Sequence, residues 1–431
     1  MGQFFTVDPR VQSLMTGLVK HRSGTALEPS AGAGHLVAAL HASHPGLDFT
    51  CVEMDSALPW DLPFDRVSAE FLSWSSSRDG SFDVVIANPP YVSWKDAPET
   101  VRALAAARAT HWHGKVNMYH LFIERCAELL QHAGEMVFIV PMDWMFQTAT
   151  APLRDKLLSM GAITHVAHLG EERVFPDADV PALCVFRFQR GARRVKVSYK
   201  PSLEEPWESR RLLTTKDRWL LLSEDAASLV SGWEPLGAQY DVRVGMVTGM
   251  DAAFRVDPST VEPACVRMVL TTTRSLEPFL DVNFAKSESE IPALALEHLL
   301  AYKEGLIARR IRSFDESNWW QWGAVRNATA MGSNAARFYA LAKTRDARPF
   351  FSHAGRPYHS AGVLGLYRQR GALDVRTALQ VANGTAFRGV LDGMLLTTNG
   401  KVQLQPATLE AALFPTDKAS AAAALSYGQP V

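Results

Sequence analysis

The stretch Asp83-Val84-Val85-Ile86-Ala87-Asn88-Pro89-Pro90-Tyr91 indicates the fold class of this 431-residue chain. Its first half is a short, β-branched apolar run, which is typical of a buried parallel strand. The two prolines that follow prevent both further ladder pairing and a helix. The tetrapeptide at residues 88–91 is therefore expected at the carboxyl end of a strand, at the edge of an open α/β sheet where ligands bind.

The tetrapeptide suits a planar group that carries an NH2. Asn88 offers a side-chain carbonyl as acceptor, Pro89 a stiffened backbone carbonyl, and Tyr91 a flat aromatic face. Two acceptors would hold the amine hydrogens and draw the nitrogen lone pair out of conjugation with its ring, while the tyrosine stacks on that ring. Such a lone pair can attack a methyl donor. The alternative is a rigid turn after the strand, with Asn88 as its cap.

Strand-like runs alternate with helical patterns along the first half of the chain. We predict strands at residues 25–28, 49–54, 83–87, 136–140, 163–169, 182–188 and 195–199, and helices within 1–20 and at 35–40, 116–132 and 152–160. This alternation predicts an α/β fold with a doubly wound, mostly parallel sheet and helices on both faces.

The length of the chain predicts two domains, because 431 residues exceed what one compact core usually supports. We place the first domain at residues 1–235 and a second, mixed α+β domain at residues 236–431. The composition changes at residues 201–211, which are expected to form the domain joint, and a helical and loop connection is expected at residues 212–233. The Ala/Ser-rich tail at residues 416–431 is expected to be loosely ordered.

A cofactor site is predicted around the stretch Glu28-Pro29-Ser30-Ala31-Gly32-Ala33-Gly34, which forms a tight turn between a strand and a helix. Gly32 and Gly34 let the backbone approach a ligand closely, and the following helix presents unpaired N–H groups. A carboxylate at Glu28 would repel a pyrophosphate but suits the ammonium group of an amino-acid-like ligand. The turn therefore favours S-adenosylmethionine over a dinucleotide.

Two further acids are candidates for the same cofactor. Glu53 ends the next strand, where a carboxylate can accept from both ribose hydroxyls of a nucleoside, with Met54 against the adenine ring. Glu70 would accept from the adenine amine while Phe71 packs on the ring. The alternatives are a solvated acid at a strand end and a surface glutamate beside a core phenylalanine.

Two residues remote from these motifs are also candidates. Thr6 precedes a helix that would close over a ligand at the sheet edge, although a helix that only packs on the sheet has the same pattern. Phe175, within Glu171-Glu172-Arg173-Val174-Phe175-Pro176-Asp177, would supply an aromatic face opposite Tyr91, although such a residue also suits a core.

The charge of the chain is uneven. The net charge is −1, but residues 302–376 hold 13 Lys and Arg against 5 Asp and Glu, a local balance of 13 − 5 = +8. Basic side chains and tryptophans are interleaved there: Arg309, Arg310, Arg312, Trp319, Trp320, Trp322, Arg326, Arg337, Lys343, Arg345, Arg348 and Arg356. Such a mixture suits phosphate contacts and packing on bases, or else a charged surface over a small tryptophan core.

The four cysteines lie far apart without metal-ligand spacing, so we expect buried reduced thiols and no metal site. No window reaches the ~18 to 20 uninterrupted apolar residues of a membrane span, and the first residues lack the pattern of a signal peptide. We therefore expect no membrane partner and a cytoplasmic location.

In their order, four motifs carry a resemblance to a known family: Gly2-Gln3-Phe4-Phe5-Thr6, the stretch from Glu28 to Gly34, Glu53-Met54-Asp55, and Asn88-Pro89-Pro90-Tyr91. With them the chain resembles the gamma-class adenine-N6 DNA methyltransferases, most closely the TaqI-type enzymes of restriction-modification systems. The similarity covers about residues 2–255, and the remainder fits a target-recognition domain in length.

The resemblance implies a role for each motif. Thr6, Glu28, Ser30, Glu53, Met54, Glu70 and Phe71 would line the S-adenosylmethionine site, beside Gly32 and Gly34 of the turn. Asn88 and Pro89 would hold the target amine, and Tyr91 and Phe175 would stack on the flipped base. The partner would be double-stranded DNA, with association to the nucleoid and a cognate restriction endonuclease that acts on the same site without stable association. Val7 and Glu70 depart from the usual proline and aspartate of the family.

Other functions remain open from the residues. The same tetrapeptide and cofactor serve protein glutamine-N5 methyltransferases and RNA base methyltransferases, and a non-catalytic DNA-binding specificity protein would be a different class. The segment before the cofactor turn and the nearly 200 residues after the first domain argue against the glutamine enzyme. The tetrapeptide leaves cytosine-N4 methylation open, and adenine follows from the resemblance.

Overall fold

The computed structural model describes residues 6–93, 117–169, 183–215, 218–394 and 401–428, together with positions 96, 99, 102, 103, 106, 397 and 398. The chain divides into two compact units, Met1–Ala227 and Ser228–Val431. The composition change at residues 201–211 therefore lies inside the first unit.

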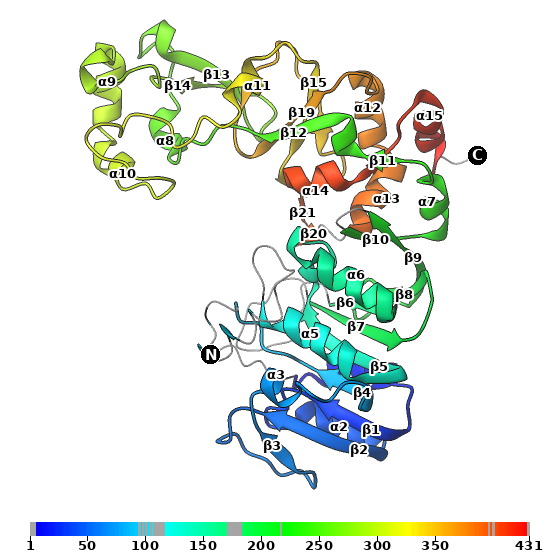
Figure 1. Ribbon diagram of the computed structural model, residues 1–431. Coiled ribbons are helices and arrows are strands. Elements are labelled where there is room, and N and C mark those ends of the chain that lie inside the picture. Colours follow the sequence, from blue (N-terminus) through cyan, green and yellow to red (C-terminus); the bar gives the residue numbers. More distant parts are fainter. Residues whose placement is uncertain are drawn as a thin grey trace. The chain divides into compact units, whose positions relative to one another are not determined.

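A ten-stranded sheet forms the centre of the first unit, in the order β10-β9-β8-β6-β7-β5-β4-β1-β2-β3 (Figure 1). Its strands are β1 (Ser23–Glu28), β2 (Gly46–Glu53), β3 (Arg66–Ser68), β4 (Phe82–Ala87), β5 (Leu130–Pro141), β6 (Gly161–His168), β7 (Leu183–Arg190), β8 (Lys196–Lys200), β9 (Glu208–Thr215) and β10 (Arg218–Leu222). Strands β3, β2, β1, β4 and β5 are parallel, and β7 lies antiparallel between β5 and β6. The predicted α/β fold with a mostly parallel sheet is confirmed.

The strand order reverses between β1 and β4. From β1 the chain moves outward to β2 and β3, and then returns to the other side of β1 to form β4 and β5. Such a switch point leaves a crevice at the carboxyl ends of the two strands, because their connections run to opposite sides. Glu28 ends β1, and the tetrapeptide with Asn88 directly follows β4, so both motifs lie at this crevice.

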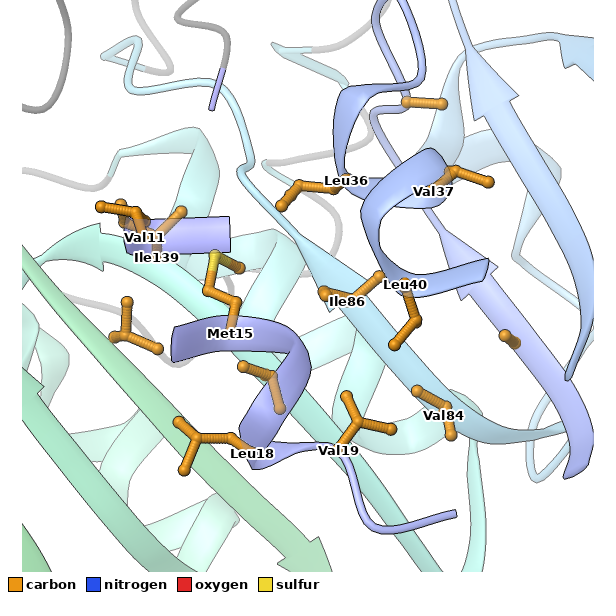
Figure 2. Close-up of a cluster of buried hydrophobic side chains, with 14 of the residues drawn as sticks. Val11, Met15, Leu18, Val19, Leu36, Val37, Leu40, Val84, Ile86 and Ile139 are labelled. Atoms are coloured by element: carbon orange, nitrogen blue, oxygen red, sulfur yellow. The ribbon is translucent and has the colours of Figure 1, made fainter. Parts of the chain in front are cut away.

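Helices cover the sheet because its central strands are apolar on both faces. The helical elements of this unit are α1 (Pro9–Leu18), α2 (His35–Ser43), α3 (Phe71–Trp74), α5 (Met118–Leu129), η2 (Met142–Met145), η3 (Thr148–Thr150), α6 (Ala151–Met160) and, across the division between the units, α7 (Glu224–Leu229). Figure 2 shows α1 and α2 side by side, with Met15 and Leu40 in one buried apolar cluster with Ile86 of β4. Val85 is equally buried but lies outside this cluster, so it faces the opposite side of the sheet.

The helix and loop connection predicted at residues 212–233 is wrong for strands β9 and β10 and right for the part that follows, where α7 lies. This segment begins inside β9, which pairs antiparallel with β10 and extends the sheet by a hairpin. Every residue of β10 is buried. A strand that is buried on both faces has no alternation of apolar and polar residues, so its pattern does not separate it from a helix.

The second unit combines short sheets and helices. Its strands are β11 (Glu234–Pro235), β12 (Tyr240–Val244), β13 (Val266–Leu270), β14 (Leu276–Leu280), β15 (Arg337–Leu341), β16 (Lys343–Thr344), β17 (Phe350–Phe351), β18 (Tyr358–His359), β19 (Val363–Arg368), β20 (Thr397–Thr398), β21 (Lys401–Gln403) and β22 (Leu413–Phe414). Its helical elements are η4 (Leu236–Ala238), α8 (Asp251–Phe254), η5 (Pro263–Cys265), η6 (Glu288–Glu290), α9 (Ala293–Leu300), α10 (Lys303–Ile307), α11 (Ala328–Gly332), α12 (Val375–Ala382), α13 (Thr385–Gly393), α14 (Pro406–Ala411) and α15 (Lys418–Ser426). The largest sheet has the order β12-β19-β15-β17, and this unit is α+β, as predicted.

The loosely ordered tail predicted at residues 416–431 is wrong over most of its length, because α15 occupies it. Asp417 caps this helix, accepting from the Ser420 amide, and the Ser420 side chain completes a capping box. Ala421 and Ala424 are buried. Alanine is the best helix former, so a cap followed by alanines predicts a helix better than it predicts disorder.

Two further observations concern the chain as a whole. Cys51, Cys126, Cys184 and Cys265 are buried free thiols, as predicted. Within the part of the chain that the structure describes, no helix combines the length and the apolar character that crossing a membrane requires.

Candidate active site

One hydroxyl group joins the two motifs at the switch point. The Oγ of Ser30 lies 3.2 Å from the backbone oxygen of Asn88 and 3.4 Å from Oε1 of Glu28, and it is the donor in both contacts. The turn after β1 and the tetrapeptide after β4 are therefore in direct contact.

The glycine turn after β1 needs backbone conformations that other residues rarely adopt. Gly32 has φ 55° and Gly34 has φ 81°, and Gly34 is the N-cap of α2. A Cβ atom on Gly34 would lie 2.6 Å from Cδ1 of Leu62. The sequence signal for a tight turn at these two glycines thus has a geometric cause.

Glu28 is a buried carboxyl group, with 2% of its surface exposed. It accepts from the backbone N–H of Ser30 at 3.1 Å. Burial raises the pKa of Glu28 to about 8, against the lowering effect of the hydrogen bonds from Ser30 and with a smaller contribution from the nearby Glu53 carboxylate. Among the described residues, no lysine or arginine forms an ion pair with Glu28, so the site suits a cationic group supplied by a ligand.

Glu53 closes the neighbouring turn and keeps acceptor capacity. Its Oε2 accepts from Gly32 N–H at 2.8 Å, and its Oε1 accepts from Asp55 N–H at 2.8 Å. A carboxylate has about four acceptor positions, so about two remain for other donors such as ribose hydroxyls. Met54 beside it is 62% exposed and offers an adaptable apolar surface to a flat ring.

The third acid has a structural role in its own helix. Both carboxylate oxygens of Glu70 cap α3, accepting from Leu72 N–H at 3.0 Å and Ser73 N–H at 2.7 Å. Phe71 is buried, with its ring centroid 4.7 Å from that of Phe122. These contacts explain both side chains as helix cap and core, and their contact with a cofactor stays a prediction.

Thr6 has a buried hydroxyl group that no described residue satisfies. The residue is 4% exposed, its Oγ1 lacks a hydrogen-bond partner within the described ranges, and its backbone oxygen accepts from Gln12 Nε2 at 2.8 Å. An unsatisfied buried hydroxyl costs about 1–3 kcal/mol. Such a group indicates a place for a ligand atom.

The tetrapeptide is anchored by its tyrosine. Pro89 is buried and Asn88 is half-buried. The Tyr91 hydroxyl donates to the backbone oxygen of Ile139 in β5 at 2.8 Å, and burial raises the pKa of this hydroxyl well above its ordinary range. The ring of Tyr91 meets that of Tyr119 edge-on, with 5.9 Å between centroids and 84° between planes.

Tyr119 and Asp143 were not among the predicted site residues. The Tyr119 hydroxyl donates to Asp143, which directly follows β5 in η2 and also accepts from the Gln147 side chain. Asp143 follows shortly after the predicted strand at residues 136–140, and an acid in that position could have indicated a site residue at the sheet edge. No sequence signal distinguishes Tyr119. Phe175 lies outside the described residues.

Comparisons with known proteins show what the chain as a whole is similar to. Residues 47–175 match the family described as Eco57I restriction-modification methylase. Over 299 residues the chain is 30% identical to the type II methyltransferase M.TthHB8I of Thermus thermophilus. The aligned region covers 63% of this chain and 64% of that protein. The chain is a relative of the restriction-modification methyltransferases. The type II methyltransferase M.HindII of Haemophilus influenzae is 23% identical over 399 residues, 80% of this chain and 75% of that protein.

A solved structure of a restriction-modification enzyme has a similar fold. The type IIL restriction-modification enzyme MmeI, solved in complex with DNA, is 11% identical, covers 96% of this chain and 65% of that chain, and gives a TM-score of 0.58. At this identity the likeness concerns the fold alone. The predicted resemblance to methyltransferases of restriction-modification systems is confirmed as a similarity to these proteins.

In this relative of the restriction-modification methyltransferases, the tryptophans of the second unit form a core. Trp319, Trp320 and Trp322 are buried, and the indoles of Trp320 and Trp322 donate to the backbone oxygens of Ala285 and Leu280. The prediction that these rings pack on DNA is wrong, and the alternative of a tryptophan core is right.

The arginines of the same region divide by exposure. Arg309 and Arg337 are buried and donate to backbone oxygens, so they are structural. The other basic residues singled out in the sequence are exposed: Arg310, Arg312, Arg326, Lys343, Arg345, Arg348 and Arg356. These exposed side chains therefore form a basic surface even when the buried Arg309 and Arg337 are not counted.

A groove of about 800 Å³ lies in the second unit between β13, α11 and the segment before β18. Its lining includes Arg267 and Arg356 and contains no Asp or Glu. The Arg267 guanidinium lies 4.4 Å from the centroid of the Tyr358 ring. Arg267 forms an ion pair with Asp281, so the positive charge of the groove comes mainly from Arg356. The groove thus combines positive charge with aromatic surface, which suits phosphate and sugar contacts.

Proposed function

We propose that the chain is a site-specific DNA methyltransferase that transfers a methyl group from S-adenosylmethionine to the N6 amine of an adenine flipped out of duplex DNA. It would be the modification enzyme of a restriction-modification system, with a cognate endonuclease that acts on the same site without stable association. One observation carries the proposal, namely the contact through Ser30 between the buried carboxyl of Glu28 and the tetrapeptide at Asn88.

The residues around β1 and β2 fit S-adenosylmethionine. Glu28 would hold the ammonium group of the ligand, because this carboxyl is buried with a raised pKa and no cationic partner among the described residues. Glu53 would accept from the ribose hydroxyls, and the buried hydroxyl of Thr6 would donate to the ligand. S-adenosylmethionine, when bound, supplies a methyl group activated by its positively charged sulfur.

The tetrapeptide would prepare the target nitrogen for attack. The Asn88 side-chain oxygen and the Pro89 backbone oxygen would accept the two amine hydrogens, which localises the lone pair on nitrogen. In-line transfer needs the reacting atoms about 3–3.5 Å apart, and a rigid strand end can impose that distance. Extruding a base from the duplex costs about a few kcal/mol. Stacking on Tyr91 would offset roughly 1–3 kcal/mol of that cost, and stacking on a second ring at Phe175 would offset more of it.

The second unit would supply DNA contacts and target recognition. Its exposed basic side chains and its acid-free groove support this assignment, because phosphate contacts dominate the affinity of proteins for DNA. Buried Arg309 and Arg337 are excluded from that role.

The direct test is modification-sensitive sequencing of DNA from cells that express the protein, compared with cells that express Asn88→Ala. We expect N6-methyladenine at one position of one short sequence, and none with the variant. A modified cytosine, or no modified base, would contradict the adenine assignment. Incubation with radiolabelled S-adenosylmethionine and DNA, RNA or protein extract separates the RNA and glutamine alternatives, since the label would then appear in those fractions.

A further inference from the structure

The first turn of α5 is attached to the chain just after the tetrapeptide. The backbone N–H of Met118 donates to the oxygen of Val92 at 2.9 Å, and Ser93 forms an antiparallel bridge with Asn117. Asn117 caps the helix by accepting from Tyr119 N–H at 3.3 Å. Main-chain hydrogen bonds therefore hold the start of α5 against the segment that carries Tyr91.

Tyr119 connects this segment to the end of β5. Its side chain is buried, at 2% exposure, its ring lies perpendicular to the ring of Tyr91, and its hydroxyl donates to Asp143. Strand β5 pairs with β4, with Phe138 opposite Ala87. The contact from Tyr91 through Tyr119 to Asp143 therefore joins the segments that follow two neighbouring strands, β4 and β5.

The turn that carries Asp143 is held firmly. Its neighbours Met142, Trp144 and Met145 in η2 are buried, whereas Asp143 is only half-buried. The Gln147 side chain donates to the second oxygen of Asp143, so both carboxylate oxygens have partners. The direction of the carboxylate is thus fixed by packing on one side and by hydrogen bonds on the other.

Two contacts together determine the orientation of the Tyr91 ring. The hydrogen bond from its hydroxyl to Ile139 places one end of the ring, but rotation about the axis through that oxygen remains possible. The perpendicular ring of Tyr119 blocks this rotation, because edge-to-face contact requires one relative orientation. Asp143 in turn holds Tyr119.

We infer that Tyr119 and Asp143 are positioning residues for the target base, which fix the orientation in which the ring of Tyr91 stacks on the extruded adenine. This inference deepens the proposed function and rests on it. Neither residue touches the reacting atoms, so their effect would pass through Tyr91.

The experiment uses the full chain and a duplex that carries the recognition sequence mapped by sequencing. The variants are Tyr119→Phe, Asp143→Ala and Asp143→Asn. Tyr199→Phe is the matched control, because Tyr199 is also a buried tyrosine of the first unit but lies in β8, with β6, β7 and β5 between that strand and β4. The readouts are kcat, the fluorescence of 2-aminopurine at the target position, the affinity for S-adenosylmethionine, and Tm.

We expect Tyr119→Phe and Asp143→Ala to lower kcat about tenfold to a hundredfold, as small misplacements do in active sites. The fluorescence rise should shrink in the same variants, while cofactor affinity and Tm follow the Tyr199→Phe control. Asp143→Asn keeps an acceptor oxygen for Tyr119 and should restore most of the activity. On a duplex whose target base faces an abasic site, the loss should be smaller because extrusion costs less there.

Two outcomes would overturn the inference. The first is that kcat and fluorescence are unchanged in Tyr119→Phe. The second is that activity falls equally on the paired and the abasic duplex and cofactor affinity is lost as well, because such a pattern indicates a purely structural role. If Tyr119→Phe does not fold, the comparison of Asp143→Ala with Asp143→Asn decides, and equal activities contradict the inference. Failure of the proposed function is distinguishable, since the wild-type protein would then neither methylate the duplex nor raise the fluorescence.

Discussion

At the scale of single residues, the side-chain oxygen of Asn88 is the group whose removal tests the chemistry most directly. Asn88→Ala removes one of the two acceptors for the target amine. We expect kcat to fall by about a hundredfold to a thousandfold, the size of loss found when one preorganised hydrogen-bonding group is removed from an active site. Affinity for S-adenosylmethionine should persist, because Glu28, Glu53 and Thr6 are unchanged. Methyl transfer to the mapped duplex and calorimetry measure the two quantities, and near wild-type turnover would refute the role of Asn88.

Glu28 gives the site a pH dependence with a defined sign. Its folded pKa of about 8 lies above the ordinary 4.5, so between these values the folded state binds more protons than the unfolded state. The stability of the ligand-free first unit therefore falls as pH rises through this window. A ligand ammonium requires the ionised carboxylate, so binding releases a proton.

The affinity for S-adenosylmethionine should consequently increase with pH, by up to about tenfold per unit below pH 8. Glu28→Gln should bind the cofactor weakly and with little dependence on pH, and it should also remove the decline of Tm with rising pH. Calorimetry in buffers of different ionisation enthalpy would count the released proton. A wild-type affinity that does not change with pH would contradict the assignment of Glu28 to the ammonium group.

At the scale of elements, two glycines in neighbouring elements should respond to alanine with opposite signs. Gly34 has φ +81° at the start of α2, and its added Cβ would contact Leu62, whereas Gly17 lies within α1 with nothing within 4 Å of an added Cβ. Gly34→Ala should destabilise by about 1–2 kcal/mol. Gly17→Ala should stabilise by about 0.5–1 kcal/mol. Thermal melting measures both, and equal effects would show that the turn lacks the conformation described.

The same elements show what the sequence can predict. Strand β4 and its prolines were predictable, because a buried parallel strand has a continuous apolar run and proline ends it. Strand β10 has a similar run but was assigned to a connection, because its neighbours lack the βα alternation that identified the others. Local pattern thus predicted the parallel half of the sheet and missed the hairpin that extends it.

Contacts between distant positions explain the rest of the difference. The hydrogen bond from Tyr119 to Asp143 depends on the meeting of α5 with the end of β5, and neither residue carries a local signal for it. Likewise, the pattern of Arg309 and Trp319 is that of a nucleic-acid surface, yet their hydrogen bonds to backbone oxygens and to Glu288 place both in a core. The motifs of the candidate site were readable because each lies within a few residues of a strand end.

At the scale of the whole molecule, total charge is a poor guide to the partner. The chain has a net charge of −1, whereas residues 302–376 carry an excess of +8 from 13 − 5. Several carboxylates of the first unit are already neutralised by internal ion pairs, such as Glu135 with Arg187 and Glu124 with Lys156. The exposed basic side chains of the second unit are therefore the main candidates for contact with a polyanion.

This distribution leads to a prediction about the groove of the second unit. Arg356 is exposed, and its one hydrogen bond to a described residue is a 3.4 Å contact to Asn334. It lines the groove, and that lining contains no carboxylate. If it contacts a phosphate, Arg356→Ala should weaken DNA binding on all sequences and reduce the slope of log affinity against log salt by about 0.9. Arg388→Ala is the matched control, because Arg388 lies in the same unit but pairs with Asp392 on its own helix. Fluorescence anisotropy over a salt series would measure the slopes, and an identical slope for Arg356→Ala and the wild type would exclude this groove from the phosphate contacts.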